Sequence, residues 1–226
     1  MNGATEGNPS RSVLWASVFH CGPGLLGLLL AGCFDLDPTP VPVAYASITD
    51  ARDSQVYRTL TVQGMTWMQQ DLNYQAPGAI CPDTLSTCSF RLYSWSTAMG
   101  VDSRFDTTLF GDSDGYRQGI CPAGWHLPTV AEWLELEKIM RLPGMSENWA
   151  SSDGTGFDLK GWSQSGYDWQ GWYWIKDETG PATARIAQFQ VSYPMPGPQG
   201  FITIEQVTPE PKKAKLGVRC LLDGPK

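Results

Sequence analysis

The chain has 226 residues, of which 42% are hydrophobic and 17% are charged, a composition typical of one globular domain rather than of a disordered or fibrous protein. Its formal net charge of −7 results from 16 basic and 23 acidic side chains. No overall positive field would attract a phosphate backbone, so we expect no nucleic-acid partner.

The first 32 residues include a long apolar segment that leads up to a cysteine. After Arg11 the apolar stretch SVLWASVFHCGPGLLGLLLAGC ends with small residues directly before Cys33. The likeness to lipoprotein signals implies cleavage before Cys33 and lipid on its thiol and new amino terminus. The alternative is a retained transmembrane helix, which the GPG break at 22–24 disfavours because such a helix needs about 20 unbroken apolar residues. We therefore expect a lipid-anchored cell-envelope protein at the outer membrane or cell surface.

Residues 33–55 contain prolines at alternate positions, Pro38, Pro40 and Pro42, and this spacing favours an extended tether that folds poorly. The pattern changes at Val56, where VYRTLTV, a QG turn and MTWMQQ together indicate a β-hairpin. The expected organisation is therefore a signal peptide over 1–32, a tether over 33–55 and a folded domain over 56–226.

Two helices are expected next. SWSTAM at 94–99 indicates a short helix, and a stronger one follows HLPT, where Thr129 and Glu132 have the spacing of a capping box. The second helix is expected to continue to about Arg141, before a Pro-Gly pair. Its buried stripe is expected to consist of Val130, Trp133, Leu136 and Met140, with Glu135 and Lys138 on the opposite face.

The rest of the chain predicts short strands separated by glycine and proline. The segments are GWYWIKD, ARIAQFQVSY, GFITIEQV and KLGVRCLLD. Because these strands do not alternate with long helices, we predict an α+β fold of short antiparallel strands rather than a parallel sheet with a binding crevice.

The cysteines predict disulfides. If cleavage removes Cys21 and lipid occupies Cys33, an even set remains: Cys81, Cys88, Cys121 and Cys220. An exported chain meets oxidising conditions, although four cysteines allow three connectivities. The short spacing favours a bridge from Cys81 to Cys88, which leaves Cys121 with Cys220. A zinc site would need tight pairs such as C-x-x-C, which the sequence lacks, so we expect no metal and no cofactor.

Several motifs occur in a characteristic order: VYRTLTVQGMTWMQQDLNY, RLYSWSTAM, GICPAGWHLPTVAEW, GTGFD, GWYWI and GVRCLLD. From about Val56 to Asp223 the chain resembles the Fibrobacter succinogenes major paralogous domain, FISUMP. The resemblance implies a secreted or lipid-anchored protein with a variant of the C-type-lectin-like fold and no established biochemical activity. The chain departs from the family after Met140, where a short RLPGMSENWASSD segment stands, and in the unusually aromatic tract 162–174.

The segment HLPTVAEW is also similar to a helix start in formylglycine-generating enzymes, which share the lectin-like fold. Their C-terminal catalytic cysteine arrangement has no counterpart here, so their reaction is not carried over. His126, the only histidine after Cys33, would need a nucleophile or metal partners to act in catalysis, and Cys121 is expected in a disulfide. We therefore expect His126 to form structural hydrogen bonds beneath the helix start, and we expect no enzyme.

Two charged clusters are interpreted as solvated. Asp112 and Asp114, with Asp102 and Asp106 upstream, suggest calcium, but the third oxygen ligand and the later glutamate of an EF-hand loop are absent. The basic PKKAK segment at 211–215 is interpreted as a solvated loop without a functional role.

The aromatic tract GWSQSGYDWQGWYWIKD at 161–177 is the most informative functional feature. Along a strand, Tyr173 and Trp174 would face opposite sides, a pattern typical of a strand buried on both faces, so both are expected in the core. The other candidates are Trp162, Tyr167 and Trp169, which lie among Gly, Ser, Gln and Asp in an expected loop. There they could stack on sugar rings.

The resulting functional hypothesis is a non-catalytic binding or adhesion module that contacts polysaccharide through Trp162, Tyr167 and Trp169. The alternative is a structural envelope protein in which the same aromatic side chains form an interface with another envelope protein. An enzyme that depends on His126 is the least favoured hypothesis.

Overall fold

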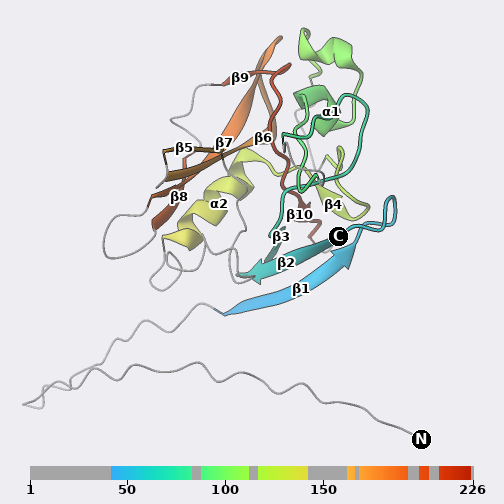
Figure 1. Ribbon diagram of the computed structural model, residues 1–226. Helices are drawn as coiled ribbons and strands as arrows, with labels where there is room; N and C mark the ends of the chain where they lie inside the picture. The colour runs from blue at the N-terminus through green and yellow to red at the C-terminus, as the bar shows by residue number, and fades with distance from the viewer. Residues whose placement is uncertain are drawn as a thin grey trace, which may run out of the picture. The chain divides into compact units, whose positions relative to one another are not determined.

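Strands dominate the part of the chain that the structure describes, and there they form two antiparallel sheets accompanied by two α-helices (Figure 1). The computed structural model describes residues 42–82, 88–111, 117–141, 162–165, 168–192, 199–203 and 209–224. The expected signal peptide over 1–32 and the expected lipidation site Cys33 lie outside these residues. None of the helices in the described part has the length and hydropathy of a membrane span.

The first sheet has the strand order β1-β2-β3-β10-β4. Its members are β1 (Val43–Thr49), β2 (Val56–Val62), β3 (Met65–Met68), β4 (Trp125–His126) and β10 (Leu221–Leu222). The predicted hairpin is confirmed, because β2 pairs with β3 through the two-residue turn Gln63–Gly64. Both turn residues have positive φ, 47° and 80°, as tight hairpin turns require.

The folded part begins earlier than the sequence predicted. Strand β1 lies within the expected tether, yet it pairs with β2 along its whole length, from Val43 opposite Val62 to Thr49 opposite Val56. The boundary placed at Val56 is therefore corrected to a position before Val43. The segment VAYASIT follows the last proline of the alternating run and contains no proline itself. Each of its residues therefore has a backbone N–H that can pair with the edge of β2.

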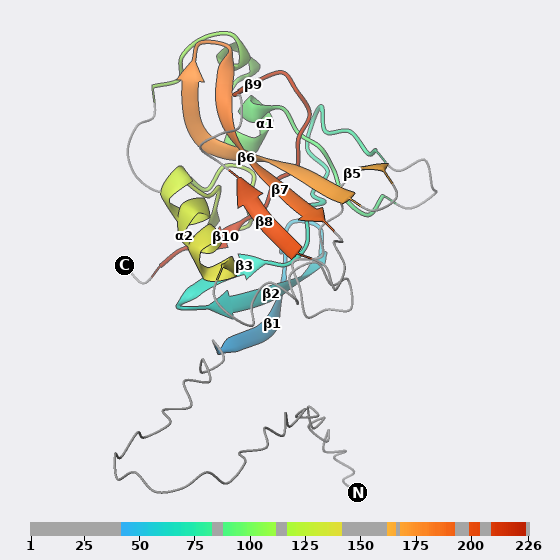
Figure 2. The same ribbon diagram turned by 90° about the vertical axis from the view of Figure 1, so that its left-hand side faces the viewer.

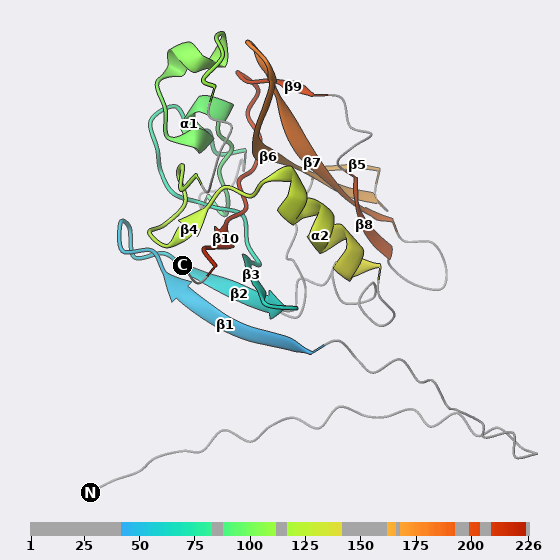
Figure 3. The same cartoon turned by 180° about the vertical axis from the view of Figure 1, so that it is seen from behind.

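The second sheet has the order β5-β6-β7-β8, and β9 pairs with β7 beyond this path (Figure 3). Its members are β5 (Trp162–Ser165), β6 (Asp168–Gly180), β7 (Thr183–Ser192), β8 (Gln199–Thr203) and β9 (Glu210–Pro211). The long β6–β7 hairpin follows the predicted strands GWYWIKD and ARIAQFQVSY, and β8 follows GFITIEQV.

Both predicted helices are confirmed. They are α1 (Trp95–Met99) and α2 (Val130–Met140), with the 3-10 turn η1 (Ser103–Asp106) between them. Thr129 and Glu132 form the predicted capping box, and Trp133, Leu136 and Met140 are buried as expected. Figure 2 shows α2 beside β3 and β8, and its buried face joins residues of both sheets in one core cluster. In that cluster Trp133 stacks on Tyr173 with ring centroids 5.8 Å apart.

The described residues contain two disulfides, and both have the predicted partners. Cys81 bonds to Cys88, and Cys121 bonds to Cys220. Cys121 and Cys220 are fully buried in a second core cluster, which also contains Trp95 and Trp174. The predicted α+β class with short antiparallel strands, two helices and disulfides is therefore confirmed.

Candidate functional site

The aromatic tract forms a hairpin rather than the expected loop. Trp162 begins β5, Trp169 lies in β6, and Ser163 is opposite Trp169 in the antiparallel pairing. The loop assignment is therefore wrong for Trp162 and Trp169, because the backbone of β6 continues its ladder past Gly171 and offers an edge to β5. Tyr167 and the side chains of Trp162 and Trp169 lie outside the described part.

Further along β6 the strand is buried on both faces at Tyr173 and Trp174, as predicted. Tyr173 is 1% exposed and belongs to the cluster around α2, whereas Trp174 is 0% exposed and belongs to the cluster around the Cys121–Cys220 disulfide. The indole Nε1 of Trp174 donates to the carbonyl of Tyr93 at 2.7 Å. Trp172, which shares a face of the strand with Trp174, is only half-buried.

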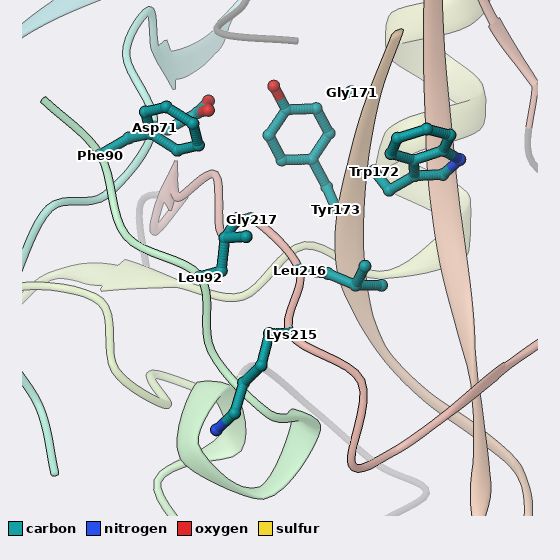
Figure 4. A pocket seen from close by; sticks show the side chains of 9 residues that line it. All are labelled: Asp71, Phe90, Leu92, Gly171, Trp172, Tyr173, Lys215, Leu216 and Gly217. Carbon is teal, nitrogen blue, oxygen red and sulfur yellow. The ribbon is translucent and has the colours of Figure 1, made fainter. Parts of the chain in front are cut away.

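Trp172 lines a small cavity with a volume of about 30 Å³ (Figure 4). In this view the carboxylate of Asp71 and the hydroxyl of Tyr173 lie at one end, and Trp172 and Leu216 lie on the other side. Lys215 reaches away from Tyr173. This volume admits a water molecule or the hydroxyl group of a ligand, but not a sugar ring.

Beneath the cavity lies a buried network centred on Arg219, which is 0% exposed. Its Nη2 donates to the carboxylate of Asp71 and to the hydroxyl of Tyr173, the latter at 3.3 Å. Burial raises the pKa of Tyr173 above its ordinary value, and the charge of Asp71 adds to the effect. Burial by itself would lower the pKa of Arg219, but Asp71 and Tyr173 hold it above the ordinary value. The network therefore stays as an ion pair with a neutral phenol.

Two glycines make room for the ring of Tyr173. A Cβ on Gly171 would lie 2.9 Å from the Tyr173 ring and hydroxyl, and a Cβ on Gly217 would lie 3.0 Å from the opposite edge of the ring. Gly217 also exchanges backbone hydrogen bonds with Trp172 and Trp174. The glycines of GWYWI and GVRCLLD are thus explained by the close approach of one aromatic side chain.

His126 links the start of α2 to the C-terminal segment. Its Nε2 lies 2.9 Å from Glu132 Oε1, and its Nδ1 lies 2.8 Å from Asp223 Oδ1. Because both partners are carboxylates that accept, both ring nitrogens donate and the imidazole is charged. Burial would lower the pKa of His126, but Glu132 and Asp223 raise it above the ordinary value of 6.5. This geometry agrees with the predicted structural role beneath the helix start.

Replacing His126 with glutamine is expected to destabilise the protein by about 1 to 2 kcal/mol at about pH 6, and by less at about pH 9. A raised folded-state pKa means that the imidazolium contributes fully below its ordinary value of 6.5 and that this contribution is lost as the pH rises through the raised pKa. Glu132, whose pKa is lowered from 4.5, contributes above that value and loses its contribution as the pH falls through the lowered pKa. Urea unfolding at both pH values measures the difference, and a pH-independent difference would contradict this account.

The burial of Lys212 contradicts the interpretation of the whole PKKAK segment as a solvated loop. It is 0% exposed, and its Nζ pairs with Glu178 and donates to the carbonyls of Phe105 at 3.0 Å and Thr108 at 3.1 Å. Burial would raise the pKa of Glu178, but Lys212 and two backbone amides hold it below its ordinary value. A buried ammonium is tolerated here because several oxygens surround it.

Of the four aspartates in the expected acidic cluster, two lie outside the described residues and two accept hydrogen bonds within the protein. Asp112 and Asp114 lie outside the described residues. Asp102 accepts from the amide of Arg104 at 2.8 Å, and Asp106 accepts from the amide and hydroxyl of Ser96 at 3.0 and 2.9 Å. The described residues contain no group of acidic, histidine or cysteine side chains that could hold a metal ion.

Sequence reasoning missed several buried charges, among them Asp71, Lys212 and Arg219. The available signal was weak: Arg219 stands within the apolar run GVRCLL, and Asp71 directly follows the predicted hairpin. A charge inside an apolar segment indicates a buried partner, but it does not say which residue the partner is.

Comparison with protein families identifies the family of the folded part. The family model described as Fibrobacter succinogenes major domain (Fib_succ_major) matches residues 52–221, which is more than half of the chain and includes both disulfides and the cavity of Figure 4. No curated protein and no solved structure matches the chain.

Proposed function

The chain belongs to the Fibrobacter succinogenes major domain family, and from this premise we propose that its folded part is a non-catalytic binding module that contacts polysaccharide. The contact surface consists of the β5–β6 hairpin, with Trp162, Tyr167 and Trp169, and of the adjacent Trp172. The finer fold assignment, a C-type-lectin-like architecture, is part of the same proposal.

One observation carries the proposal: Trp172 stays half-buried in a strand whose neighbours Tyr173 and Trp174 are completely buried. Trp172 lines the cavity of Figure 4 together with Lys215 and Leu216. Sugar rings stack on flat aromatic faces, and a cavity of this size receives a hydroxyl group beside a polar side chain. The tryptophans at positions 162 and 169 stand a few residues away along the same hairpin.

A binding role is also favoured by the way in which the described reactive groups are occupied. Both ring nitrogens of His126 contact carboxylates, Arg219 pairs with Asp71, and Lys212 pairs with Glu178. Groups held in this way stabilise the fold and are poorly placed to transfer protons to a substrate.

Replacing Trp172 with alanine is expected to weaken binding of a soluble neutral polysaccharide by about tenfold, because a stacked aromatic contact contributes roughly 0.5 to 1.5 kcal/mol beyond its buried area. Replacement with phenylalanine, which keeps a flat face, should restore most of the affinity. Affinity electrophoresis against a polysaccharide panel measures the effect.

The control is Tyr45 replaced by alanine, since Tyr45 is 50% exposed on β1 in the other sheet. Binding that is absent in the unmodified protein, or unchanged when Trp162, Tyr167 and Trp169 are all replaced by alanine, would reject the proposal. Pull-down from envelope extracts with the unmodified and triple-alanine chains tests the competing protein partner.

The location in the cell is a separate part of the proposal. The LAGC segment supports a lipid-anchored protein of the cell envelope, at the outer membrane or cell surface, with lipid on Cys33. Mass spectrometry of the protein isolated from its cells is expected to show a chain that begins at Cys33 and carries lipid. An unprocessed chain without lipid would reject this part.

A further inference from the structure

A second, larger hollow lies beside α1. This groove has a volume of about 580 Å³ and is polar. Its lining includes Ser94, Ser96, Thr97, Arg104, Lys213 and Lys215. Lys215 also lines the cavity beside Trp172, so the two hollows are neighbours on the folded domain.

The walls of the groove are fixed to one another by Lys212. Its Nζ donates to the carbonyls of Phe105 and Thr108 on the η1 side, and its own carbonyl accepts from the amide of Trp95 at the start of α1. Lys215 donates to the carbonyl of Gly78 at 2.7 Å, which attaches the remaining wall. A groove held by contacts of this kind is organised before a ligand arrives, so less ordering opposes binding.

The floor and one wall present hydroxyl and carboxylate groups. The hydroxyls of Ser94 and Thr97 lie 2.9 Å apart, and Ser94 and Ser96 are 3.2 Å apart. Asp106 on the floor is held by Ser96, and Asp102 caps η1 at the rim. Hydroxyl and carboxylate oxygens in such an array match the hydroxyl groups of a sugar.

The charge of the groove differs from that of the chain. Arg104, Lys213 and Lys215 oppose Asp102 and Asp106, so three cations and two carboxylates leave one positive charge in a chain whose net charge is −7. Arg104 and Lys213 are exposed and can turn towards a ligand. A guanidinium and an ammonium that both line a hydroxyl-rich groove form a good partner for a carboxylate.

We propose that this groove binds a sugar residue that bears a carboxylate, so that the polysaccharide contacted by the domain is acidic. The inference rests on the proposed function and specifies its ligand class. The carboxylate of the sugar pairs with Arg104 and Lys213, its hydroxyl groups contact Ser94, Thr97 and Asp102, and the neighbouring sugars of the polymer reach Trp172 past Lys215.

The test compares two forms of one polymer. The full chain is titrated with oligogalacturonate and with its methyl ester, which keeps the sugar rings and removes the negative charges. The acid is expected to bind at least about tenfold more tightly, and its affinity should fall with added salt. Replacing Lys213 or Arg104 with glutamine should weaken binding of the acid about two- to fivefold and leave the methyl ester unaffected.

The matched control is Arg185→Gln, which removes the same charge from an exposed position on β7 outside the groove and should change the affinity less than about twofold. Equal binding of acid and ester, or equal effects of Arg185→Gln and Lys213→Gln, overturns the inference while the proposed function stands. Equal affinity for polyglutamate also overturns it, because any polyanion would then suffice. Binding of the acid that depends on Lys213 but not on Trp172 supports the groove and rejects the proposed aromatic surface.

Discussion

Replacing Arg219 with methionine is expected to lower the free energy of unfolding by about 3 to 5 kcal/mol, the largest effect of any single exchange proposed for this protein. Arg219 is 0% exposed and its guanidinium pairs with the carboxylate of Asp71, whose side chain is 3% exposed. It also donates to the main-chain carbonyls of Met68 and Gln69 at the end of β3. Methionine fills a similar volume, so the main consequence is a buried carboxylate without its cation.

Urea unfolding at neutral pH measures this effect. The double variant Arg219→Met/Asp71→Leu should recover part of the loss, because it removes both charges rather than one. Arg141→Met is the control, since Arg141 pairs with Glu137 on the surface of α2 with 67% of its side chain exposed. Its expected cost is below about 1 kcal/mol. An Arg219→Met protein as stable as this control would show that the buried pair contributes little.

Local signals were sufficient to predict much of the fold. The hairpin of β2 and β3 followed from two β-rich segments around a QG turn, and α2 followed from the capping box at Thr129 and Glu132. The burial of Tyr173 and Trp174 followed from the two-residue period of a strand. In each case the residues that decide the structure lie within a few positions of one another.

The features that sequence reasoning missed depend on residues that are far apart in the chain. Arg219 and Asp71 are separated by 148 positions, and Lys212 donates to Phe105 across 107 positions. Read locally, PKKAK is a basic surface loop, and only the fold shows that carbonyls and Glu178 surround its first lysine. Strand β1 was missed because alternating prolines dominate the segment before it, while the edge that it joins belongs to β2.

The candidate site could be predicted only in outline. The aromatic tract directed attention to Trp162, Tyr167 and Trp169, whereas Trp172, which is half-buried in the structure, was not singled out. The polar groove could not be predicted, because its walls come from four separate segments that Lys212 and Lys215 join. Its cations were visible in the sequence, but their common position beside α1 was not.

Removal of the Cys121–Cys220 disulfide by alanine at both positions is expected to destabilise the protein by about 4 to 5 kcal/mol. The bridge spans 99 positions and joins the corner before Trp125 to the segment before β10 that carries Arg219. In the chain-entropy model a crosslink stabilises the fold by restricting the unfolded chain, and the restriction grows with the length of the closed loop.

The Cys81–Cys88 bridge supplies the matched control, because it spans only 7 positions. The same model gives about 2.5 kcal/mol for its removal, so the two double-alanine variants should differ by about 2 kcal/mol in urea unfolding under oxidising conditions. Cys121 and Cys220 are also fully buried, so their replacement adds a small packing loss in the same direction. A short bridge that stabilises the protein more than the long one would contradict this account. Restriction of the unfolded chain could then not be the main source of the stabilisation.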